Sequence, residues 1–359
     1  MIAPLPRRDL PTPALIVDRA ALERNIAAMA AFAEAQGVAL RPHAKTHKSG
    51  EIARRQIAAG AAGICCAKLA EAEALAADGV GNIHLTSPVV TPAAIERLAA
   101  LSRRIALSVV VDHPDNARAL GAGAAGLAVF IDVDPGSHRT GVTSAAAALA
   151  LAQAIAATGT LTLGGVQFYC GSHQHIQSLA ERRAAIVERT DYLRGVLDAL
   201  RDAGFAVPIV TGGGTGTFAI DASLGVFTEL QVGSYIFLDR EYLDCELAGP
   251  RFEPALFVDA TVVSANTPGM VTIDAGLKAF ATDAGVPVVL AGAPEGSGYA
   301  FTGDEHGALR GGALPGLGER VTLMPPHCDP TVNLYDRYQL VEGDEVVDSW
   351  PVTARGRST

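Results

Sequence analysis

Short apolar runs alternate with longer amphipathic stretches over the first two thirds of the chain. The apolar runs are rich in Val, Ile, Leu and Ala and have the length of buried strands, whereas the stretches between them have helical periodicity. This alternation is typical of parallel strands joined by helices, and eight such units close into a barrel. The clearest helical stretches are residues 68–78, 91–101, 144–157 and 179–204. The eight predicted strands are residues 38–44, 61–66, 82–86, 106–112, 126–132, 164–170, 207–211 and 228–236.

The pattern changes after about residue 245. Short strands and turn dipeptides replace the helical stretches, which predicts a smaller, mainly β domain. Residues 14–19 are also strand-like but precede the first barrel strand, so they are candidates to join this β domain. The predicted fold is therefore α/β, a (β/α)8 TIM-like barrel followed by a smaller, mainly β C-terminal domain. The predicted limits are residues 20–245 for the barrel, and residues 1–19 with 246–359 for the β domain.

Composition excludes several classes of partner. The chain has 28 Lys and Arg against 38 Asp and Glu, and its net charge of −10 disfavours nucleic acid. The five cysteines include no Cys-x-x-Cys pair, which fits a reducing compartment. No stretch approaches the roughly 18 apolar residues that a membrane span requires, and the first residues contain no apolar signal core. We therefore expect a cytoplasmic protein without a membrane or nucleic-acid partner.

Polar residues gather directly after the predicted barrel strands. The active site of a parallel barrel forms at the carboxyl ends of its strands, so these segments are the candidate site. They are residues 41–48 after strand one, 132–139 after strand five, 167–175 after strand six, 211–217 after strand seven and 233–235 after strand eight.

The glycine-rich loop 212–217 is a candidate phosphate site. Consecutive glycines let backbone N–H groups approach an anion, and Thr215 and Thr217 add hydroxyl donors. The loop lacks the features of a Walker loop or a dinucleotide fingerprint, which favours a single phosphate. Barrels commonly bind a phosphate after strands seven and eight, where this loop lies. An ordinary glycine-rich turn is the alternative.

Lys45 follows the first predicted strand and is a candidate nucleophile. Loss of solvation inside a barrel is expected to lower the pKa of its amine, and a neutral amine can attack a carbonyl group. Such an amine suits an aldehyde cofactor. A solvated surface lysine is the alternative. The candidate phosphate loop on the same rim of the barrel favours the cofactor.

His327 and Asp329 lie two residues apart in the predicted β domain and offer an imidazole and a carboxylate. The two side chains share one face if the segment is extended, and together they can bind a divalent cation. The oxygen ligand favours Mn²⁺ or Mg²⁺ over Zn²⁺, unless the Cys328 thiol turns inward. A capped turn with a hydrogen-bonded histidine is the alternative.

Four motifs together carry a resemblance to a known family. They are Pro42-His43-Ala44-Lys45-Thr46-His47-Lys48, Gly212-Gly213-Gly214-Thr215-Gly216-Thr217, Glu229-Leu230-Gln231-Val232-Gly233-Ser234-Tyr235 and His327-Cys328-Asp329-Pro330-Thr331. With a likeness that runs from Thr12 to Asp336, the chain resembles the D-threonine aldolase and D-serine dehydratase family. These are pyridoxal-phosphate enzymes with the alanine-racemase fold.

The resemblance implies a role for each candidate residue. Lys45 would carry pyridoxal 5′-phosphate, Tyr169 would lie beside its ring, and Arg139 would face its phenolate oxygen. His175 would stand near the substrate β-hydroxyl as a base or water holder, and His327 with Asp329 would bind the metal. The remaining implied cofactor contacts are Thr211, Gly213, Gly214, Thr215, Gly216, Thr217, Gly233, Ser234 and Tyr235.

The implied activity is that of an aldehyde-lyase. It would cleave D-3-hydroxy amino acids such as D-threonine and D-allo-threonine to glycine and an aldehyde. Asp329, where zinc-dependent dehydratases of the family have cysteine, favours this reading over a D-serine dehydratase, which releases a keto acid and ammonia. A dehydratase of 3-hydroxy-D-aspartate stays an alternative, because the resemblance implies no difference from the aldolases at this position. A racemase and a non-catalytic carrier of pyridoxal phosphate are further alternatives. The resemblance also implies a homodimer.

Overall fold

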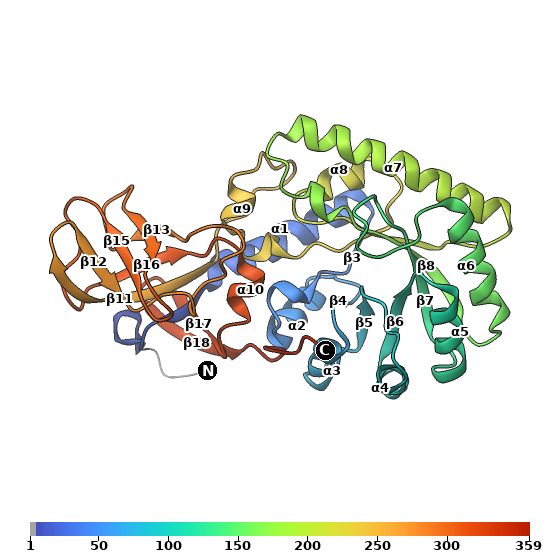
Figure 1. Cartoon of the computed structure of the whole chain (residues 1–359), viewed down its shortest axis with the longest axis horizontal. Coiled ribbons are helices and arrows are strands. Elements are labelled where there is room, and N and C mark those ends of the chain that lie inside the picture. The colour runs from blue at the N-terminus through green and yellow to red at the C-terminus, as the bar shows by residue number, and fades with distance from the viewer. Residues whose placement is uncertain (1–4) are drawn as a thin grey trace.

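The computed structural model of the chain describes residues 5–359. A parallel barrel surrounded by helices lies beside a large, mostly antiparallel sheet (Figure 1). The described residues start in the antiparallel sheet, build the barrel, and then return to the same sheet.

The barrel contains eight parallel strands in the order β3-β10-β9-β8-β7-β6-β5-β4. A parallel bridge between His43 and Cys65, with a 2.8 Å hydrogen bond from Cys65 N to Pro42 O, joins β3 to β4 and closes the ring. The predicted (β/α)8 barrel is confirmed. Its strands are β3 (Ala39–Leu40), β4 (Ile64–Cys66), β5 (Asn82–Leu85), β6 (Ala106–Val111), β7 (Ala128–Asp132), β8 (Thr162–Phe168), β9 (Ile209–Gly212) and β10 (Glu229–Leu230).

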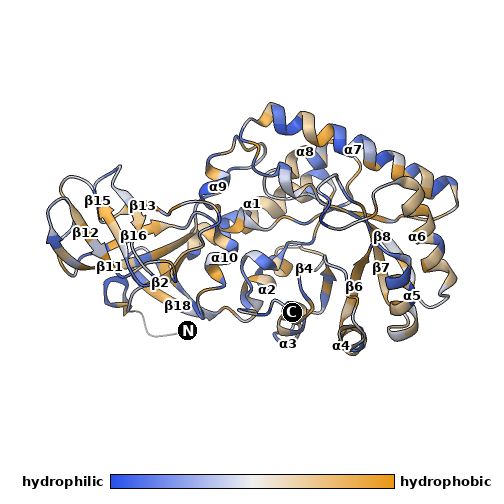
Figure 2. Ribbon diagram, in the orientation of Figure 1, coloured by the Kyte–Doolittle hydropathy of each residue, from blue (hydrophilic) through white to orange (hydrophobic). Residues whose placement is uncertain are grey.

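Helices cover the outside of the barrel, and several begin at side-chain caps. The side chains of Thr91, Ser144 and Ser178 each accept a hydrogen bond from a backbone N–H of the following turn, which fixes where α4, α6 and α7 start. Figure 2 shows hydrophilic and hydrophobic residues alternating along α7, as expected for a helix that packs on one face. The helices are α1 (Arg19–Gln36), α2 (Gly50–Ala58), α3 (Leu69–Ala77), α4 (Pro92–Ser102), α5 (Pro114–Gly123), α6 (Ala145–Ala157), α7 (Leu179–Asp202) and α8 (Phe218–Ser223).

The second sheet has ten strands. Strand β2 pairs antiparallel with β11 and parallel with β17, so residues 14–18 lie in this sheet among C-terminal strands. The exact domain limits, placed at residues 19 and 245 from the sequence, stay a prediction. The strands are β1 (Leu5–Pro6), β2 (Ala14–Asp18), β11 (Leu256–Thr267), β12 (Met270–Ile273), β13 (Val288–Ala291), β14 (Gly298–Phe301), β15 (Gly307–Arg310), β16 (Arg320–Met324), β17 (Arg337–Glu342) and β18 (Glu345–Pro351).

Strands β3 and β10 have only two residues each, far fewer than predicted, and the rest of each predicted strand lies at the rim. The chain leaves β3 after Leu40 and makes a 3₁₀ turn at Ala44–Thr46, in which the His43 side chain accepts a hydrogen bond from Lys45 N. It leaves β10 after Leu230 and makes a similar turn at Ser234–Ile236. The prediction extended the first strand to residue 44 and the eighth to residue 236, whereas residues 41–44 and 231–236 lie outside β3 and β10 and are mostly buried at the rim.

The antiparallel sheet supports the turn that carries Lys45. The Tyr338 hydroxyl on β17 donates a 2.6 Å hydrogen bond to His47 O, and Ala354 N donates a 2.9 Å bond to Lys48 O. Two short helices, α9 (Arg240–Leu243) and α10 (Cys328–Val332), lie at the junction, and α10 packs against the Ala44–Thr46 turn. The rim of the barrel therefore meets the second sheet at Lys45.

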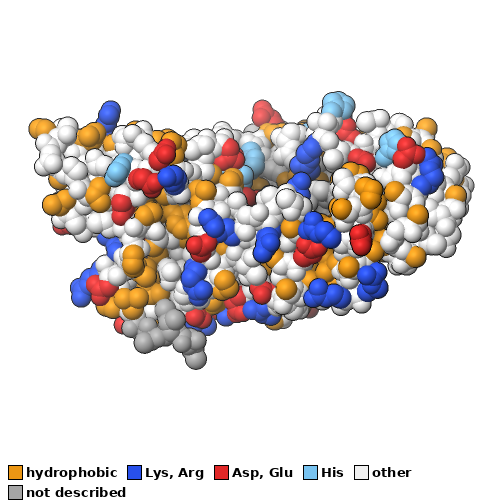
Figure 3. Space-filling view, turned by 60° about the horizontal axis from the view of Figure 1, so that its bottom comes forward, with side chains coloured by type: hydrophobic (Ala, Val, Ile, Leu, Met, Phe, Trp, Pro, Cys, Tyr) orange, Lys and Arg blue, Asp and Glu red, His pale blue; other side chains and the backbone are white. Residues whose placement is uncertain are grey.

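Acidic and basic side chains are interspersed over the face shown in Figure 3. Within residues 5–359, no helix combines the length and the apolar character needed to cross a bilayer.

Candidate active site

A cavity of about 400 Å³ opens at the carboxyl ends of the barrel strands. Its size lies in the range of small-molecule sites, roughly 300–1,000 Å³. Seven of the sequence-predicted residues line it, together with ten others. The seven are Lys45, Arg139, Tyr169, Gly214, Thr215, Gly233 and Ser234.

Lys45 reaches into this cavity from the turn after β3. Its side chain keeps 41% of its surface exposed, and its ammonium pairs with Asp329 Oδ2 of α10. Burial alone would lower the pKa of Lys45, but the Asp329 carboxylate outweighs it and raises the pKa above its usual value. The sequence-based expectation of a lowered pKa is therefore wrong, because it did not place a carboxylate beside the amine.

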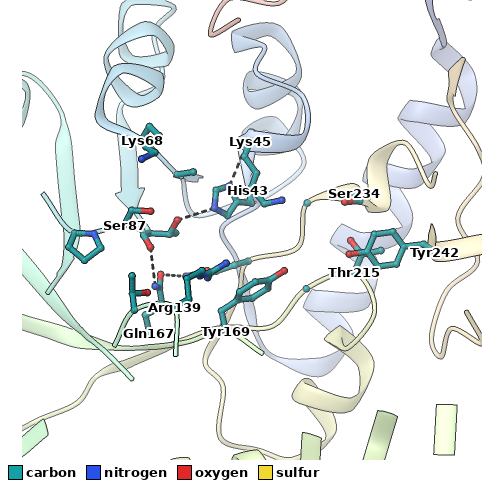
Figure 4. Close-up of a pocket in the computed structure, with 17 residues that line it drawn as sticks. His43, Lys45, Lys68, Ser87, Arg139, Gln167, Tyr169, Thr215, Ser234 and Tyr242 are labelled. Atoms are coloured by element: carbon teal, nitrogen blue, oxygen red, sulfur yellow. Dashed lines mark hydrogen bonds between the residues drawn. The ribbon is translucent and has the colours of Figure 1, made fainter. Parts of the chain in front are cut away.

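Arg139 and Tyr169 lie together on the next part of the wall. The Arg139 guanidinium lies 5.6 Å from the centre of the Tyr169 ring, and Figure 4 shows the two side chains side by side. The loop that carries Arg139 is fixed by Asp132, whose carboxylate accepts hydrogen bonds from Thr140 Oγ1 (2.7 Å) and Gln167 Nε2 (3.0 Å). Burial raises the pKa of Asp132 to about 6.

The glycine-rich loop contributes Gly214 and Thr215 to the cavity. Thr215 Oγ1 accepts a hydrogen bond from Tyr235 N (3.0 Å), which links the loop after β9 to the turn after β10. Thr215 and Ser234 both line the cavity, and each hydroxyl group has a proton to donate. These groups are suited to bind an anion opposite Lys45.

Five predicted cofactor contacts lie behind this surface instead of on it. The Thr211 hydroxyl donates to Glu229, and the Tyr235 hydroxyl accepts from Gln56. Direct contacts to a cofactor stay a prediction for all five, which are Thr211, Gly213, Gly216, Thr217 and Tyr235.

Gly213 and Gly216 of the loop have backbone reasons to be glycine. Gly213 has φ +72°, and a Cβ on Gly216 would lie 2.0 Å from Gln174 O. Gly216 N donates to Gln174 Oε1 (3.0 Å), and the Thr217 hydroxyl donates to Asp221 Oδ2 (2.6 Å). The requirements of an ordinary turn therefore explain Gly213, Gly216 and Thr217. Gly214 and Thr215 line the cavity instead.

Sequence reasoning missed several wall residues. His43 received no role from the sequence, yet it lines the cavity and its Nε2 lies 3.0 Å from Thr86 Oγ1. Gln167 and Gln231, joined by a 3.1 Å hydrogen bond, form the floor of the cavity. A polar residue inside an otherwise apolar strand was the signal that could have found Gln167.

His327 lies next to the cavity, at the start of α10, among acidic side chains. An oxygen of Asp239, an oxygen of Glu241 and a nitrogen of His327 all lie within 4.8 Å of one another. Asp283 Oδ2 lies 2.7 Å from His327 Nδ1. Burial works against the charged imidazole, but the surrounding carboxylates, Asp329 first, raise the pKa of His327. Asp239 and Glu241 are additional candidate metal ligands that the sequence did not reveal.

His175 lies on the same side of the site, in the loop after β8. Its ring centre lies 4.7 Å from that of Tyr242, a cavity residue, and its Nε2 lies 4.0 Å from Glu241 Oε2. Partial burial lowers the pKa of His175, so the neutral imidazole that can accept a proton predominates at neutral pH.

Comparison with known proteins identifies the family. The alanine racemase N-terminal domain family matches residues 17–241, and a serine dehydratase domain family matches residues 255–341. A D-threonine aldolase of Arthrobacter sp is 43% identical over 99% of this chain and 95% of its own length. The chain belongs to the D-threonine aldolase and D-serine dehydratase family.

Two other relatives agree with this family assignment. The 3-hydroxy-D-aspartate aldolase of Paracoccus denitrificans (strain Pd 1222) is 38% identical over 97% of this chain and 93% of its own length. The crystal structure of D-threonine aldolase from Filomicrobium marinum superposes with a TM-score of 0.96 at 40% identity, covering 100% of this chain and 99% of that one. The alanine-racemase-like fold predicted from the sequence is confirmed.

The cavity fits the pyridoxal phosphate that the family implies. An amine that is accessible from the cavity can bond to the aldehyde, and Thr215, Ser234 and the glycine backbone can bind the phosphate. The Arg139 cation stands beside the tyrosine ring that is expected to contact the cofactor.

The acidic cluster likewise fits a divalent cation. Asp239 is 2% exposed, and among residues 5–359 its Oδ1 has no hydrogen-bond partner. A buried carboxylate oxygen without a donor costs free energy unless a cation or a hydrogen bond compensates it.

Proposed function

We propose that this protein is a pyridoxal-phosphate-dependent aldehyde-lyase that cleaves D-3-hydroxy amino acids, such as D-threonine and D-allo-threonine, to glycine and an aldehyde. The observation that carries the proposal is one shared cavity. Lys45 faces the anion-binding side chains of Thr215 and Ser234 there, and the donors around His327 lie next to it. The aldolases among the relatives support the same activity.

Five residues of the cavity would hold and orient the cofactor. Lys45 holds the cofactor, which when bound supplies an electron sink for charge that develops at Cα. Thr215 and Ser234 hold its phosphate. Tyr169 and Arg139 orient its ring from the opposite wall.

His175 is the proposed base that removes the proton of the substrate β-hydroxyl. Its lowered pKa keeps the imidazole neutral and able to accept that proton. A divalent cation held by His327 and Asp329, when bound, lowers the pKa of a hydroxyl that it contacts. The carboxylate donors favour Mn²⁺ or Mg²⁺ over Zn²⁺.

Asp329 has a second contact in this structure, because its carboxylate pairs with Lys45. With Lys45 holding the cofactor, this amine would be engaged elsewhere. Asp329 would then be available for the cation. The homodimer and the cytoplasmic location stay predictions.

The test is the product formed from D-threonine. Purified protein with pyridoxal phosphate and Mn²⁺ should form glycine and acetaldehyde in equal amounts, and chelation with EDTA should stop the reaction until Mn²⁺ is restored. Release of a keto acid and ammonia instead would assign the dehydratase reaction. This reaction is the second candidate, because residues 255–341 match the serine dehydratase domain family. Bound cofactor without turnover of any D-amino acid would indicate a carrier.

A further inference from the structure

Lys68 lines the cavity, and the local fold gives no reason for a lysine at this position. It lies after β4 and directly before α3, where its side chain makes no capping hydrogen bond. Lysine is a poor residue for the start of a helix, because the positive end of the helix dipole disfavours a cation. The lysine therefore destabilises α3 slightly, which an anion bound beside it would offset.

The ammonium group of Lys68 has no partner among residues 5–359, in which it makes no ion pair and no hydrogen bond. Glu71, the acidic residue nearest to it in the sequence, is fully buried. The Glu71 carboxylate instead accepts hydrogen bonds from Lys48 Nζ (3.1 Å) and Ala67 N (2.7 Å). The Lys68 cation is therefore available to a ligand.

The wall of the cavity has an excess of positive charge. Lys45, Lys68 and Arg139 line it, and within residues 5–359 no acidic side chain does. Asp329 compensates Lys45, and Arg139 lies against the Tyr169 ring. Lys68 is the cation of this wall that has no compensation, so the cavity favours a ligand with an anionic group near it.

Lys68 and the phosphate-binding side chains lie on opposite sides of Lys45 (Figure 4). The strand order agrees with this view. Strand β4, which precedes Lys68, adjoins β3 on one side, whereas β10 and β9, which precede Ser234 and Thr215, lie on the other. A phosphate held by Thr215 and Ser234 therefore leaves Lys68 for a second anion.

Ser87 offers a hydroxyl group on the same side of the cavity as Lys68. Strands β4 and β5 pair in parallel with Cys66 opposite Leu85, so Lys68 and Ser87 occupy equivalent positions beyond the two strand ends. Both residues line the cavity. An ammonium group and a hydroxyl group can each donate a hydrogen bond to an oxygen of one carboxylate.

We propose that Lys68, together with Ser87, binds the α-carboxylate of the substrate. The inference rests on the proposed function, because it names the wall that recognises the D-3-hydroxy amino acid. Every amino acid of this class brings an α-carboxylate into the cavity, and a carboxylate removed from water needs a cation or hydrogen-bond donors. Lys68 supplies the cation, since Lys45 holds the cofactor.

Three substitutions at two sites test this role. Lys68→Met removes the ammonium and keeps an unbranched side chain, and Lys68→Arg keeps the positive charge. Lys68→Ser also removes the charge but places a favourable capping residue at the start of α3, so it covers the case in which Lys68→Met does not fold. Lys278→Met is the matched control, because Lys278 is 64% exposed and pairs with Glu305 away from the cavity.

The first readout is binding, measured by the absorbance of the pyridoxal-phosphate-loaded protein during titration with glycine or glycinamide. Glycine has the α-carboxylate but no side chain, and glycinamide lacks the carboxylate. Lys68→Met and Lys68→Ser are expected to raise the Kd for glycine on the order of 10- to 100-fold, as loss of a charge-assisted hydrogen bond does, and to leave that for glycinamide within about twofold. Lys68→Arg should recover most of the loss, and Lys278→Met should change neither Kd.

The second readout is kinetic. With D-threonine, Lys68→Met should raise KM by a similar factor and change kcat by less than about threefold, because the contact is present before and during the reaction. Equal weakening of glycine and glycinamide binding would show a merely structural role and overturn the proposal. So would an effect confined to 3-hydroxy-D-aspartate, which would place Lys68 at a side-chain carboxylate, or equal affinity of the unsubstituted protein for glycine and glycinamide.

The two levels of the account fail separately. If the unsubstituted protein forms glycine and acetaldehyde from D-threonine while Lys68→Met and Lys68→Ser bind glycine as tightly as it does, only this inference fails. If D-threonine yields other products while the Kd for glycine depends on Lys68 as expected, the proposed reaction fails and the carboxylate site stands.

Discussion

Replacing Gln174 by alanine removes the side chain that ties the glycine-rich loop to the loop after β8. Gln174 is 1% exposed. Its Oε1 accepts from Gly216 N at 3.0 Å, and its Nε2 donates to Thr217 Oγ1 at 3.0 Å and to Cys170 O at 3.2 Å. One amide therefore bonds to two residues of the loop that presents Thr215 to the cavity.

The expected loss follows from these contacts. Three hydrogen bonds disappear, each worth about 1 kcal/mol net, and the buried Gly216 N–H group loses its acceptor. We expect the free energy of unfolding to fall by about 2–4 kcal/mol. If ordering the loop around the phosphate takes about 1.4 kcal/mol from the binding free energy, the apparent Kd for pyridoxal phosphate rises tenfold.

Titration of the cofactor-free protein with pyridoxal phosphate, followed by absorbance, measures this Kd. Urea unfolding measures the change in stability. Gln177→Ala is the control, because Gln177 lies in the same segment with an exposed side chain. A Gln174→Ala variant that matches Gln177→Ala in both measurements would refute the reasoning that Gln174 supports the phosphate-binding surface.

Two further substitutions test groups around the site. Burial raises the pKa of the Asp221 carboxyl group from 3.8 to about 7. Between about pH 4 and 7 the folded chain therefore keeps a proton on Asp221 that the unfolded chain releases. The free energy of unfolding falls as the pH rises through this range. Asp221→Asn should remove this pH dependence of stability, worth roughly 4 kcal/mol, in urea unfolding across that range. An unchanged pH dependence would show that Asp221 is not its source. Lys48→Met should lower the free energy of unfolding by about 3–5 kcal/mol, because the buried Glu71 carboxylate loses the ammonium that lies 3.1 Å away. The double variant with Glu71→Gln should recover most of this loss. A loss no larger than that of Lys68→Met, at an exposed lysine, would contradict the buried pair.

The barrel could be predicted from the sequence because each of its strands is a short apolar run between helical stretches. The hydrophobic pattern mispredicted segments that are buried but do not form strands. Residues 41–44 and 231–236 are mostly buried at the rim but lie outside the strands, and buried apolar residues among them, such as Val232 and Ile236, resemble the continuation of a strand. Their shape depends on contacts with distant segments, such as the hydrogen bond from Tyr235 N to Thr215.

The site was predictable where a motif carries its own chemistry, as at Lys45 and His327. Asp239 and Glu241 have no such motif, and they join His327 only because α9 and α10 meet at the junction of the barrel and the second sheet. The raised pKa of Lys45 has the same origin, since its partner Asp329 is distant in the sequence. Contacts of this kind arise from tertiary structure and leave no local pattern.

The central claim is that the Lys45 amine carries the cofactor. Borohydride reduction of the pyridoxal-phosphate-loaded protein, followed by peptide mapping, tests it most directly. The account predicts a single phosphopyridoxyl group on Lys45 and none in Lys45→Ala. A label on Lys68, the other lysine that lines the cavity, or a label that persists in Lys45→Ala, would contradict it.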